Sequence, residues 1–385
     1  MFHRIKKNNL WFNKKRSKRM NYNIIIDIEK IKEVYHIIKI NTKNKNKIIK
    51  FELFFISNIM EIYNELKNKT YKHENYNIFL IKENKYRIIM SEKMKDKIVN
   101  HLLSKYILFP IIEPHLISAN VATRKNMGSS KAINDIKKYI NKLKDKHEKI
   151  YILKCDIHKY FYSIDHKILK KKIKKYITDE NILEIIDNIL DSTNEKNINN
   201  RILKEIEKEK TYIESLKISK KEKQIKKEEL DRIPLYNYDL GLPIGNMTSQ
   251  IFAIFYLNDL DHYIKEKLHV KYYERYMDDF ILIHHDKEYL KYCLKKIEIQ
   301  IKNLNLKLND KTQIYELHNG LPFLGYKFIL KGKKLHILLS NNCKKRIKKR
   351  YKSEKNINIQ KIYNGHLINT DSKNFIHSLN SKNKT

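Results

Sequence analysis

Apolar residues recur along this chain in two spacings, one typical of strands and one typical of helices. Runs rich in Ile, Phe, Tyr and Leu predict strands at residues 77–90, where two runs flank a polar turn at 82–85, and at residues 150–155. Apolar positions every three or four residues predict helices at residues 93–107, 133–143, 247–260 and 286–304. We expect the first of these helices to end before Pro110, because proline interrupts a helix.

Residues 271–286 carry two acidic residues between two apolar runs. The runs predict strands, so Asp278 and Asp279 fall at or near a hairpin turn. Side chains alternate along a strand, so one carboxylate can face a metal while its neighbour supports it. Adjacent like charges are unfavourable unless a cation compensates them, and oxygen ligands favour Mg²⁺ or Mn²⁺. The alternative interpretation is a solvated acidic turn.

A second acidic position supports the metal interpretation. Asp156 directly follows the strand predicted at 150–155. Phosphoryl transfer by two metals needs carboxylates from separate elements, close to ions that lie about 4 Å apart. Two neighbouring strands would present such acids at one edge of a sheet, although acids at strand ends are common and the pair alone is weak evidence.

The charge balance indicates a polyanionic partner. The 385 residues include 81 Lys and Arg against 44 Asp and Glu, a formal net charge of +37. Nucleic acid is the first candidate for this partner and an anionic membrane surface the second. No apolar run approaches the ~20 residues of a membrane span, and residues 1–19 lack the apolar core of a secretory signal. The three cysteines lack metal-ligand spacing, so we expect reduced thiols in a cytoplasmic protein with no membrane partner.

Several motifs resemble those of the reverse transcriptases, and more narrowly those of the bacterial retroelement branch. Tyr276-Met-Asp-Asp279 matches the YxDD of the third catalytic segment, and Asp156 with Phe161 matches the first aspartate segment. Lys85-x-Arg87 resembles the fingers motif, and residues 306–312 resemble the Lys-bearing stretch that follows the catalytic hairpin. Residues 323–326 resemble the primer grip, and residues 363–367 resemble the closing segment of the thumb. The motifs follow the family order over residues 70–370.

The resemblance implies an α+β right-hand polymerase fold, with fingers, a palm built on an antiparallel sheet, and a helical thumb. Residues 71–335 would form fingers and palm, and residues 336–370 the thumb. A basic extension of unknown role would occupy residues 1–70 and a polar tail residues 371–385. The Lys- and Glu-rich residues 195–232 predict a solvated helical insertion, such as a hairpin.

The resemblance also implies roles for single residues. Asp156 and Asp278 would ligate two Mg²⁺ or Mn²⁺ ions, Asp279 would assist, and Ile157 would offer only its backbone carbonyl. Lys85 and Arg87 would hold the incoming triphosphate, Phe161 would exclude a ribose 2′-hydroxyl, and Lys311 would act as general acid to pyrophosphate. Tyr276 and Met277 would lie beside the primer end, and Phe323, Leu324, Gly325 and Tyr326 would form the primer grip. The alternatives are a surface charge at Arg87, a core aromatic ring at Phe161 and a plain exposed Lys311.

The segment 241–250 departs from the commonest family pattern. Many reverse transcriptases carry Gln-Gly-x-x-x-Ser-Pro here, whereas this chain has Ile244-Gly245 and Ser249-Gln250. The departure resembles the diversity-generating retroelement class, whose enzymes copy a template RNA with errors at adenines. An amide can hydrogen-bond the nucleotide and fix its position, whereas Ile cannot, and one such contact is worth on the order of 1 kcal/mol of discrimination. The alternative is that Ile244 repacks the pocket without changing fidelity.

The implied function is RNA-directed DNA polymerisation, with an RNA template, a DNA or RNA primer and dNTP substrates. The resemblance further implies a small basic accessory protein as a partner. A reverse transcriptase of phage defence or of a retron-like system is a second interpretation. A catalytically inert RNA-binding module is a third, and the intact Asp156, Asp278 and Asp279 argue against it.

Overall fold

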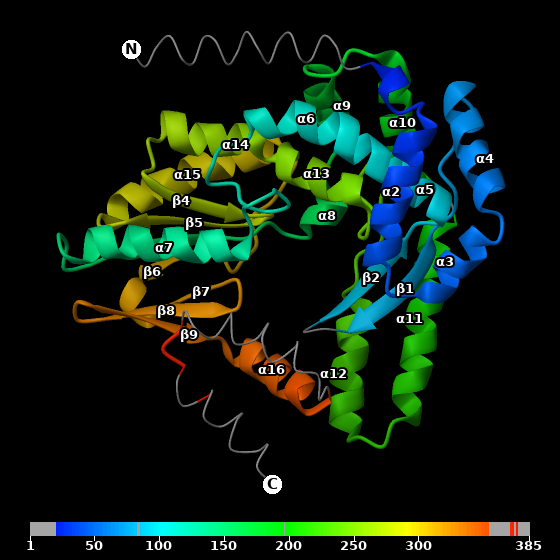
Figure 1. The fold of residues 1–385 in the computed structure, drawn as a ribbon. Helices are drawn as coiled ribbons and strands as arrows, with labels where there is room; N and C mark the ends of the chain where they lie inside the picture. Colours follow the sequence, from blue (N-terminus) through cyan, green and yellow to red (C-terminus); the bar gives the residue numbers. More distant parts are fainter. Residues whose placement is uncertain (1–20, 83–84, 196, 354–369, 373–374, 376–385) are drawn as a thin grey trace, which may run out of the picture. The chain divides into compact units, whose positions relative to one another are not determined.

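The computed structural model describes residues 21–82, 85–195, 197–353, 370–372 and 375. The chain divides into two compact units built from interleaved segments (Figure 1). Unit 1 takes in Met1–Ile117, His158–Asp259 and Lys302–Leu306, and unit 2 takes in Ser118–Ile157, Leu260–Ile301 and Lys307–Thr385. The strands of the described residues form antiparallel sheets among separate helices, which confirms the predicted α+β class.

Unit 2 is built around a four-stranded sheet in the order β4-β5-β3-β6. Its strands are β3 (Tyr151–Cys155), β4 (Tyr272–Tyr276), β5 (Asp279–His284) and β6 (Gln313–Glu316), and all neighbours pair antiparallel. The strand predicted at 150–155 is therefore present, and the 271–286 stretch is the β4–β5 hairpin. Leu153 pairs with Leu282 of β5 on one side and with Ile314 of β6 on the other, which makes β3 a central strand.

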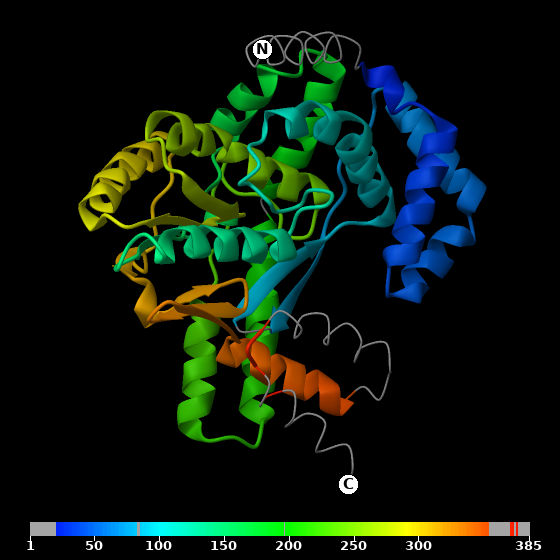
Figure 2. The ribbon, with the colours of Figure 1, turned by 60° about the vertical axis from the view of Figure 1, so that its left-hand side comes forward.

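Helices cover both faces of this sheet. Figures 1 and 2 show α7 (Ser129–Lys144) along one face and α15 (Lys287–Asn303) along the other. Apolar residues of α7 at helical spacing pack with alternate residues of the strands, as expected where a helical stripe meets one face of a sheet. This core contains Ile133, Ile136, Ile140 and Leu143 of α7, Ile152 of β3, and Ile281 and Ile283 of β5.

A smaller sheet completes the core of unit 2. It contains β7 (Leu321–Phe323), β8 (Tyr326–Lys331) and β9 (Lys334–Leu339), and α16 (Asn341–Ser353) follows it. β7 and β8 are joined by Leu324 and Gly325, whose φ angles are +48° and +86°. Such a two-residue turn with left-handed residues matches the twist of a hairpin. The thumb-like segment predicted at 363–367 lies outside the described residues.

Unit 1 is mainly helical. Its N-terminal helix α2 packs against α4 and α5, and α13 packs against α5 and α9. Buried residues of α2 such as Ile31, Val34 and Ile38 recur at helical spacing, so the described residues before position 70 contribute to a core. The helices are α2 (Ile28–Asn41), α3 (Lys45–Glu52), α4 (Phe55–Lys67), α5 (Met94–Leu103), α6 (Phe109–Ile112), α8 (Tyr160–Ser163), α9 (His166–Lys174), α10 (Glu180–Asp191), α11 (Ile198–Ser215), α12 (Lys220–Asp231), α13 (Met247–Tyr256) and, across the unit boundary, α14 (Asn258–His262).

The one hairpin of the described part of unit 1 packs against the charged insertion. β1 (Asn77–Lys82) pairs antiparallel with β2 (Tyr86–Ser91). The insertion is the helical pair α11 and α12, and Ser219 begins α12 with a capping box to Glu222. One apolar side of the pair, with Ile202, Ile206 and Ile213 of α11, is buried in a small core shared with Tyr86, Ile88 and Met90 of β2. The insertion is therefore solvated on one side only.

The expected end of the first long helix before Pro110 is wrong. After α5 the chain continues through a π-helical turn at Ser104–Leu108 into α6, and Pro110 lies in the first turn of α6. Proline is tolerated there because the N–H groups of a first helical turn have no intrahelical acceptor. In the π-helical turn the Phe109 N–H donates to the carbonyl five residues earlier, that of Ser104. The chain can therefore remain helical through the proline.

Among the described residues, no helix is both long enough and apolar enough to cross a membrane.

Glu274 of β4 is a fully buried acid in the unit 2 core. Tyr139 of α7 donates a hydrogen bond to Glu274 Oε2 at 3.2 Å. Burial, and then the charge of Asp135, raise the pKa of Glu274 to about 8, while Lys131, Tyr139 and Lys265 act in the opposite direction. The carboxyl group is therefore protonated in the folded protein at neutral pH.

We expect Glu274→Gln to flatten the pH dependence of stability. The folded state holds a proton that the unfolded state releases near pH 4.5, so wild-type stability falls as pH rises from about 4.5 to about 8. Relative to wild type, the variant should gain up to about 1.4 kcal/mol per pH unit across this window. Urea unfolding at several pH values measures this difference. The matched control is Glu288→Gln, at an acid with 74% of its side chain exposed; equal slopes for both variants would contradict the assignment.

Candidate active site

The β4–β5 hairpin places two acids at its turn. Tyr276 pairs with Asp279, so Met277 and Asp278 form a two-residue turn, and Met277 has a φ of +57°. Left-handed backbone is unfavourable for a residue with a side chain and is typical of functional sites, where surrounding structure enforces it. Asp278 and Asp279 are half-buried, and so are the side chains of Tyr276 and Met277.

Asp156 lies beside this turn. Cys155 pairs with Phe280, so continuing the β3–β5 register by one residue places Asp156 opposite Asp279. Residues directly opposite in an antiparallel pair share a face of the sheet. The sequence therefore correctly predicted that two strands present acids at one edge, and all three acids belong to unit 2.

The carboxylates repel one another in this arrangement. Burial, and then the charge of Asp156, raise the pKa of Asp278 to about 6. Burial also raises the pKa of Asp279, which Lys154 opposes. Each ionised carboxylate is thus less stable here than in water, and a cation would relieve the repulsion.

Lys154 supplies one cation to the cluster. Its Nζ lies 3.1 Å from Asp279 Oδ2 and donates a hydrogen bond to the Pro322 carbonyl at 2.8 Å. The same ammonium lies 5.6 Å from the centre of the Phe323 ring. Lys154 therefore joins the acidic turn to strand β7 within unit 2.

The cluster also fits divalent metal ions. Asp279 Oδ1 is buried and accepts no hydrogen bond from the described residues, so it is available as a ligand. Carboxylate oxygens are the ligands that Mg²⁺ and Mn²⁺ prefer.

Ile157 is also placed at this edge. It bridges to Leu308, and the Asn309 N–H donates to the Asp156 carbonyl at 2.7 Å. That hydrogen bond is accepted by the backbone carbonyl of Asp156, whereas the predicted metal donor is the backbone carbonyl of Ile157.

A buried ion pair supports the turn from behind. Arg275 and Asp261 are both fully buried, and Arg275 Nε donates to Asp261 Oδ1 at 2.7 Å. Arg275 Nη1 also donates to the Met277 carbonyl at 2.7 Å. Arg275 therefore fixes the backbone of the residue that precedes Asp278.

The remaining unit 2 candidates divide into exposed and buried residues. Lys311 is exposed in the turn before β6, where its N–H donates to Asn309 Oδ1 at 3.1 Å. Phe323 and Tyr326 are only 2% and 7% exposed and pack in the core. Leu324 and Gly325, at the tip of the β7–β8 hairpin, are partly exposed. A nucleic acid strand would thus meet the turn and not the two aromatic rings.

Unit 1 carries the candidates predicted to bind the nucleotide. Arg87 is exposed on β2, between the buried Tyr86 and Ile88, so its side chain lies on the face of the hairpin away from α11. Lys85 is exposed and directly precedes the same strand. At the other end of β2, Met90 N–H donates to the Ile244 carbonyl at 2.9 Å. One strand therefore connects Arg87 with the 241–250 segment.

The 241–250 segment also contacts Phe161. Leu242 N–H donates to the Phe161 carbonyl at 2.6 Å, and the Phe161 side chain is half-buried. Gly245 has a φ of +141°, and a Cβ there would lie 2.7 Å from the Met90 carbonyl oxygen. Glycine at 245 is thus required by the close approach of two backbones. Ile244 and Gln250 are half-buried.

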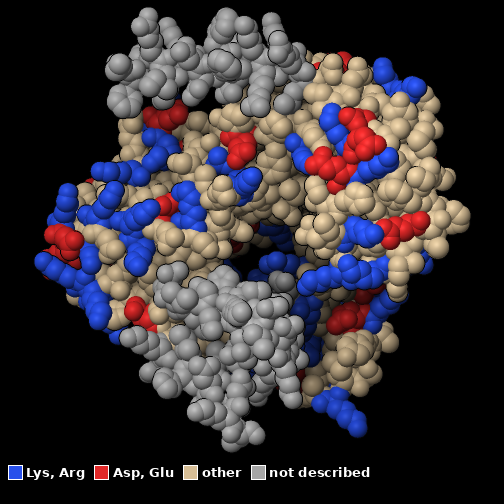
Figure 3. All heavy atoms as spheres, viewed as in Figure 1, with Lys and Arg blue, Asp and Glu red and all other residues tan. Residues whose placement is uncertain are grey.

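Positive charge is dense on the described surface of unit 2. Figure 3 shows Lys and Arg side chains gathered over α7, which carries Lys131, Lys137, Lys138, Lys142 and Lys144. Lys137, Asn141 and Lys144 line a hollow together with Lys333 and Lys334 of the β8–β9 hairpin. Such clusters attract the phosphates of nucleic acids.

Sequence reasoning missed Lys154 and Arg275. Each is a charged residue inside a run of strand-forming residues, Tyr151–Cys155 and Tyr272–Tyr276. A charge in a central strand needs a partner, because an unpaired buried charge is costly. That signal was present in both runs, although it does not identify the partner.

Comparisons with known proteins agree with this geometry. The family model described as "Reverse transcriptase (RNA-dependent DNA polymerase)" matches residues 66–328. A search of curated proteins found no match.

Solved structures similar to this chain include two telomerases. Telomerase from Candida albicans, in complex with a TWJ fragment of telomeric RNA, is 13% identical with a TM-score of 0.41, over 75% of this chain and 50% of that one. Truncated apo telomerase from Candida tropicalis is 15% identical with a TM-score of 0.44, over 73% of this chain and 59% of that one. The chain therefore spans between half and three-fifths of the length of these two structures.

The family match covers most of the chain and includes the acidic hairpin, Asp156 and the 241–250 segment. Together with the antiparallel sheets set among helices, it confirms the predicted right-hand polymerase fold. On this evidence, the chain belongs to the reverse transcriptase family of RNA-directed DNA polymerases.

Proposed function

We propose that this protein copies an RNA template into cDNA by two-metal nucleotidyl transfer, as part of a diversity-generating type of retroelement. The observation that carries the chemistry is Asp156 at the end of β3, opposite the Asp278–Asp279 turn. The observation that carries the biological role is Ile244 in place of the amide that many reverse transcriptases have. RNA template, DNA or RNA primer and dNTPs are the proposed substrates, with a small basic accessory protein as partner.

The three acids would hold two Mg²⁺ or Mn²⁺ ions. Asp156 and Asp278 would ligate both, Asp279 would assist through its Oδ1, and the Ile157 carbonyl is a further donor. When bound, the ions lower the pKa of the primer 3′-hydroxyl and stabilise charge on the α-phosphate and on pyrophosphate. Lys154 would keep Asp279 oriented by its ion pair.

Further residues would position the substrates. Arg87, with Lys85, would bind the triphosphate, and Phe161 would exclude the 2′-hydroxyl of a ribonucleotide. Lys311 would protonate pyrophosphate, Tyr276 and Met277 would lie beside the primer end, and the turn of Phe323, Leu324, Gly325 and Tyr326 would contact the primer. Gly245 would let the 241–250 segment approach β2 closely, which sets the place of Ile244, and Gln250 would lie on the same segment.

Primer extension tests the activity. Purified protein with an RNA template, an annealed DNA primer, dNTPs and Mg²⁺ or Mn²⁺ should give full-length cDNA, and substitution of rNTPs should give little product. A folded protein that binds the primed template but makes no cDNA with either ion would contradict the proposal.

Fidelity tests the diversity-generating role. We expect Ile244→Gln to lower misincorporation opposite template adenine several-fold, because a restored amide contact is worth on the order of 1 kcal/mol. Sequencing of cDNA made in vitro and in cells measures the error spectrum. Ile244→Leu is the matched control, which preserves volume without adding a hydrogen bond. An unchanged error spectrum in Ile244→Gln would show that residue 244 does not determine fidelity.

A role in phage defence or in a retron-like system is the alternative. The DNA around the gene distinguishes the two. A template repeat, a matching variable repeat and a small accessory gene would support diversification, whereas a neighbouring effector or a structured RNA would support defence.

A further inference from the structure

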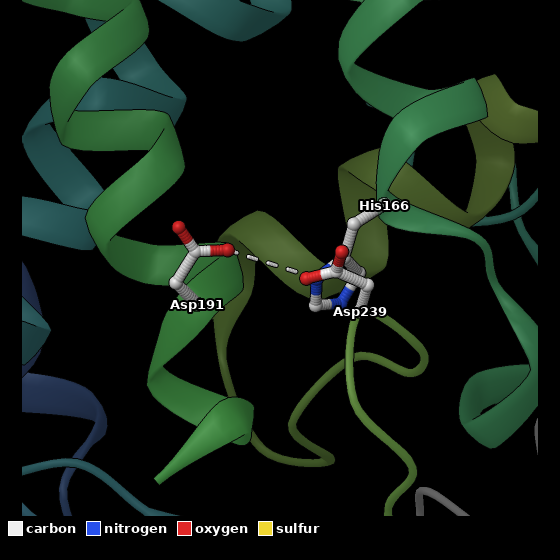
Figure 4. Close-up of side chains that lie close together, drawn as sticks. All are labelled: His166, Asp191 and Asp239. Carbon is white, nitrogen blue, oxygen red and sulfur yellow. Dashed lines mark ion pairs between the residues drawn. The ribbon is translucent and has the colours of Figure 1, made fainter.

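A second cluster of metal-ligand residues lies in unit 1, apart from the three aspartates. It contains His166 at the start of α9, Asp191 at the end of α10, and Asp239 in the loop that leads to the 241–250 segment. One ligand atom from each residue lies within 4.8 Å of the other two. Figure 4 shows Asp191 facing the ring of His166, with Asp239 beside the ring. His166 Nδ1 and Asp191 Oδ1 are 3.9 Å apart.

The hydrogen bonds of His166 fix its tautomer. Its Nε2 lies 2.7 Å from the Gly241 carbonyl oxygen, and since a carbonyl only accepts, Nε2 carries the proton. Burial lowers the pKa of His166, which favours the neutral ring with a lone pair on Nδ1. The His166 side chain is 0% exposed, and no described residue donates a hydrogen bond to Nδ1. A buried lone pair thus points at two carboxylates.

Neighbouring groups hold the two acids without satisfying Nδ1. Asn194 donates to Asp239 Oδ1 at 3.1 Å and accepts from the Asp239 N–H at 2.8 Å. Lys170 Nζ lies 3.2 Å from Asp191 Oδ1, and Lys167 Nζ lies 3.7 Å from Asp239 Oδ2. These cations reduce the charge of the acids, and neither donates a hydrogen bond to Nδ1. A lone pair facing carboxylates is repulsive unless a cation lies between them.

We propose that His166 Nδ1, Asp191 and Asp239 bind one divalent transition-metal ion, with Zn²⁺ as the preferred ion. One imidazole nitrogen with two carboxylate oxygens is a donor set that suits Zn²⁺, whereas Mg²⁺ favours oxygen ligands alone. The bond from Nε2–H to a backbone carbonyl is the usual outer contact of a metal-bound histidine, which orients the ring. The three donor atoms lie within 4.8 Å of one another, so the two acids would move closer to Nδ1 when an ion binds.

The ion would join three segments of unit 1 that are far apart in the sequence. The loop at 239–241 already contacts the α9 start, because His166 N–H donates to the Asp239 carbonyl at 3.0 Å and Asp165 bridges to Leu240. The residues that follow α10 contact the same loop through Asn194 and through Thr193, whose Oγ1 donates to the Gly241 carbonyl at 3.5 Å. Metal binding would hold α10 to the loop, and so hold the base of the segment that carries Ile244.

Metal titration of the full chain tests this proposal. The protein is stripped with a chelator and titrated with Co²⁺ or Zn²⁺ in excess Mg²⁺, which occupies the active-site acids. We expect one Co²⁺ per chain with visible absorption bands typical of a nitrogen ligand, and a rise in Tm with Zn²⁺. Asp191→Asn and Asp239→Asn should each weaken binding by at least about tenfold.

Two controls make the result specific. Asp187→Asn removes another acid of α10, which lies 3.2 Å from Lys170 but outside the cluster, and should leave metal affinity unchanged. Asp278→Asn removes an active-site acid and should also leave it unchanged. The proposal is overturned if the chain binds no Co²⁺ in excess Mg²⁺, if both cluster variants bind like Asp187→Asn, or if Asp278→Asn removes the signal. None of these outcomes depends on polymerase activity, so this proposal and the proposed function fail separately.

Discussion

Asp278→Asn is expected to abolish cDNA synthesis while leaving the protein folded. Burial and the charge of Asp156 raise the pKa of this carboxyl group to about 6, and it lies at the tip of the β4–β5 hairpin. Loss of a metal ligand that stabilises transition-state charge removes several kcal/mol, so the rate of primer extension should fall by a factor of about 10³ or more.

Stability gives this prediction a second readout. An amide at 278 carries no charge and does not repel Asp156, so the Tm of the variant should equal or exceed that of wild type at pH 8. Binding of primed RNA template, measured by fluorescence anisotropy, should change little. Asp145→Asn, at an exposed acid after α7, is the matched control and should keep full activity. Retained synthesis in Asp278→Asn would refute the metal assignment.

Among the single substitutions proposed, Arg275→Met is expected to lower the free energy of unfolding most. The substitution leaves Asp261 fully buried without a cation, with the Tyr273 hydroxyl still donating to its Oδ1 at 2.6 Å, and it removes a bond to the Met277 carbonyl. Breaking a buried ion pair on one side typically costs about 3–5 kcal/mol. The activity of the remaining folded protein should also fall, because the turn that carries Asp278 loses its support.

Urea unfolding measures the stability loss, and a double variant tests its cause. Arg275→Met with Asp261→Leu removes both charges, so it should be more stable than Arg275→Met alone. Lys291→Met breaks an exposed pair with Glu288, 51% and 74% exposed, and should change stability by only about 0–1 kcal/mol. A loss below about 1 kcal/mol in Arg275→Met would contradict the proposed support of the turn.

Much of the site was predictable because it lies on regular strands. Runs of aromatic and β-branched residues located β3 and the β4–β5 hairpin, and two neighbouring strands were then expected to present Asp156 and Asp278 at one edge of a sheet. The β7–β8 turn was located by the resemblance of residues 323–326 to the primer grip, and its left-handed Gly325 is a finding of the structure. Local rules of this kind depend on few residues, so the sequence carries them directly.

The parts that could not be predicted depend on contacts between distant segments. The partners of Lys154 and Arg275 lie on other elements, Asp279 on β5 and Asp261 before β4, and spacing does not reveal such pairs. The path through Pro110 depends on a π-helical turn that has no composition signal. The burial of Phe323 and Tyr326 depends on how the small sheet packs in the unit 2 core, which alternation along one short strand does not specify.

The interleaving of the two units has a consequence for biosynthesis. Unit 1 is completed only by Lys302–Leu306, where Leu304 accepts a hydrogen bond from Tyr256 Oη at 2.7 Å and Asn305 donates to Asp165 at 2.9 Å. A ribosome adding about 5–20 residues per second needs on the order of 10–40 s to advance from Ile117 to Leu306. For that interval the apolar faces of the helices made first lack part of their final partners. Nascent chains of this protein should therefore recruit chaperones until residue 306 has left the exit tunnel, and stalling translation before that point should increase aggregation.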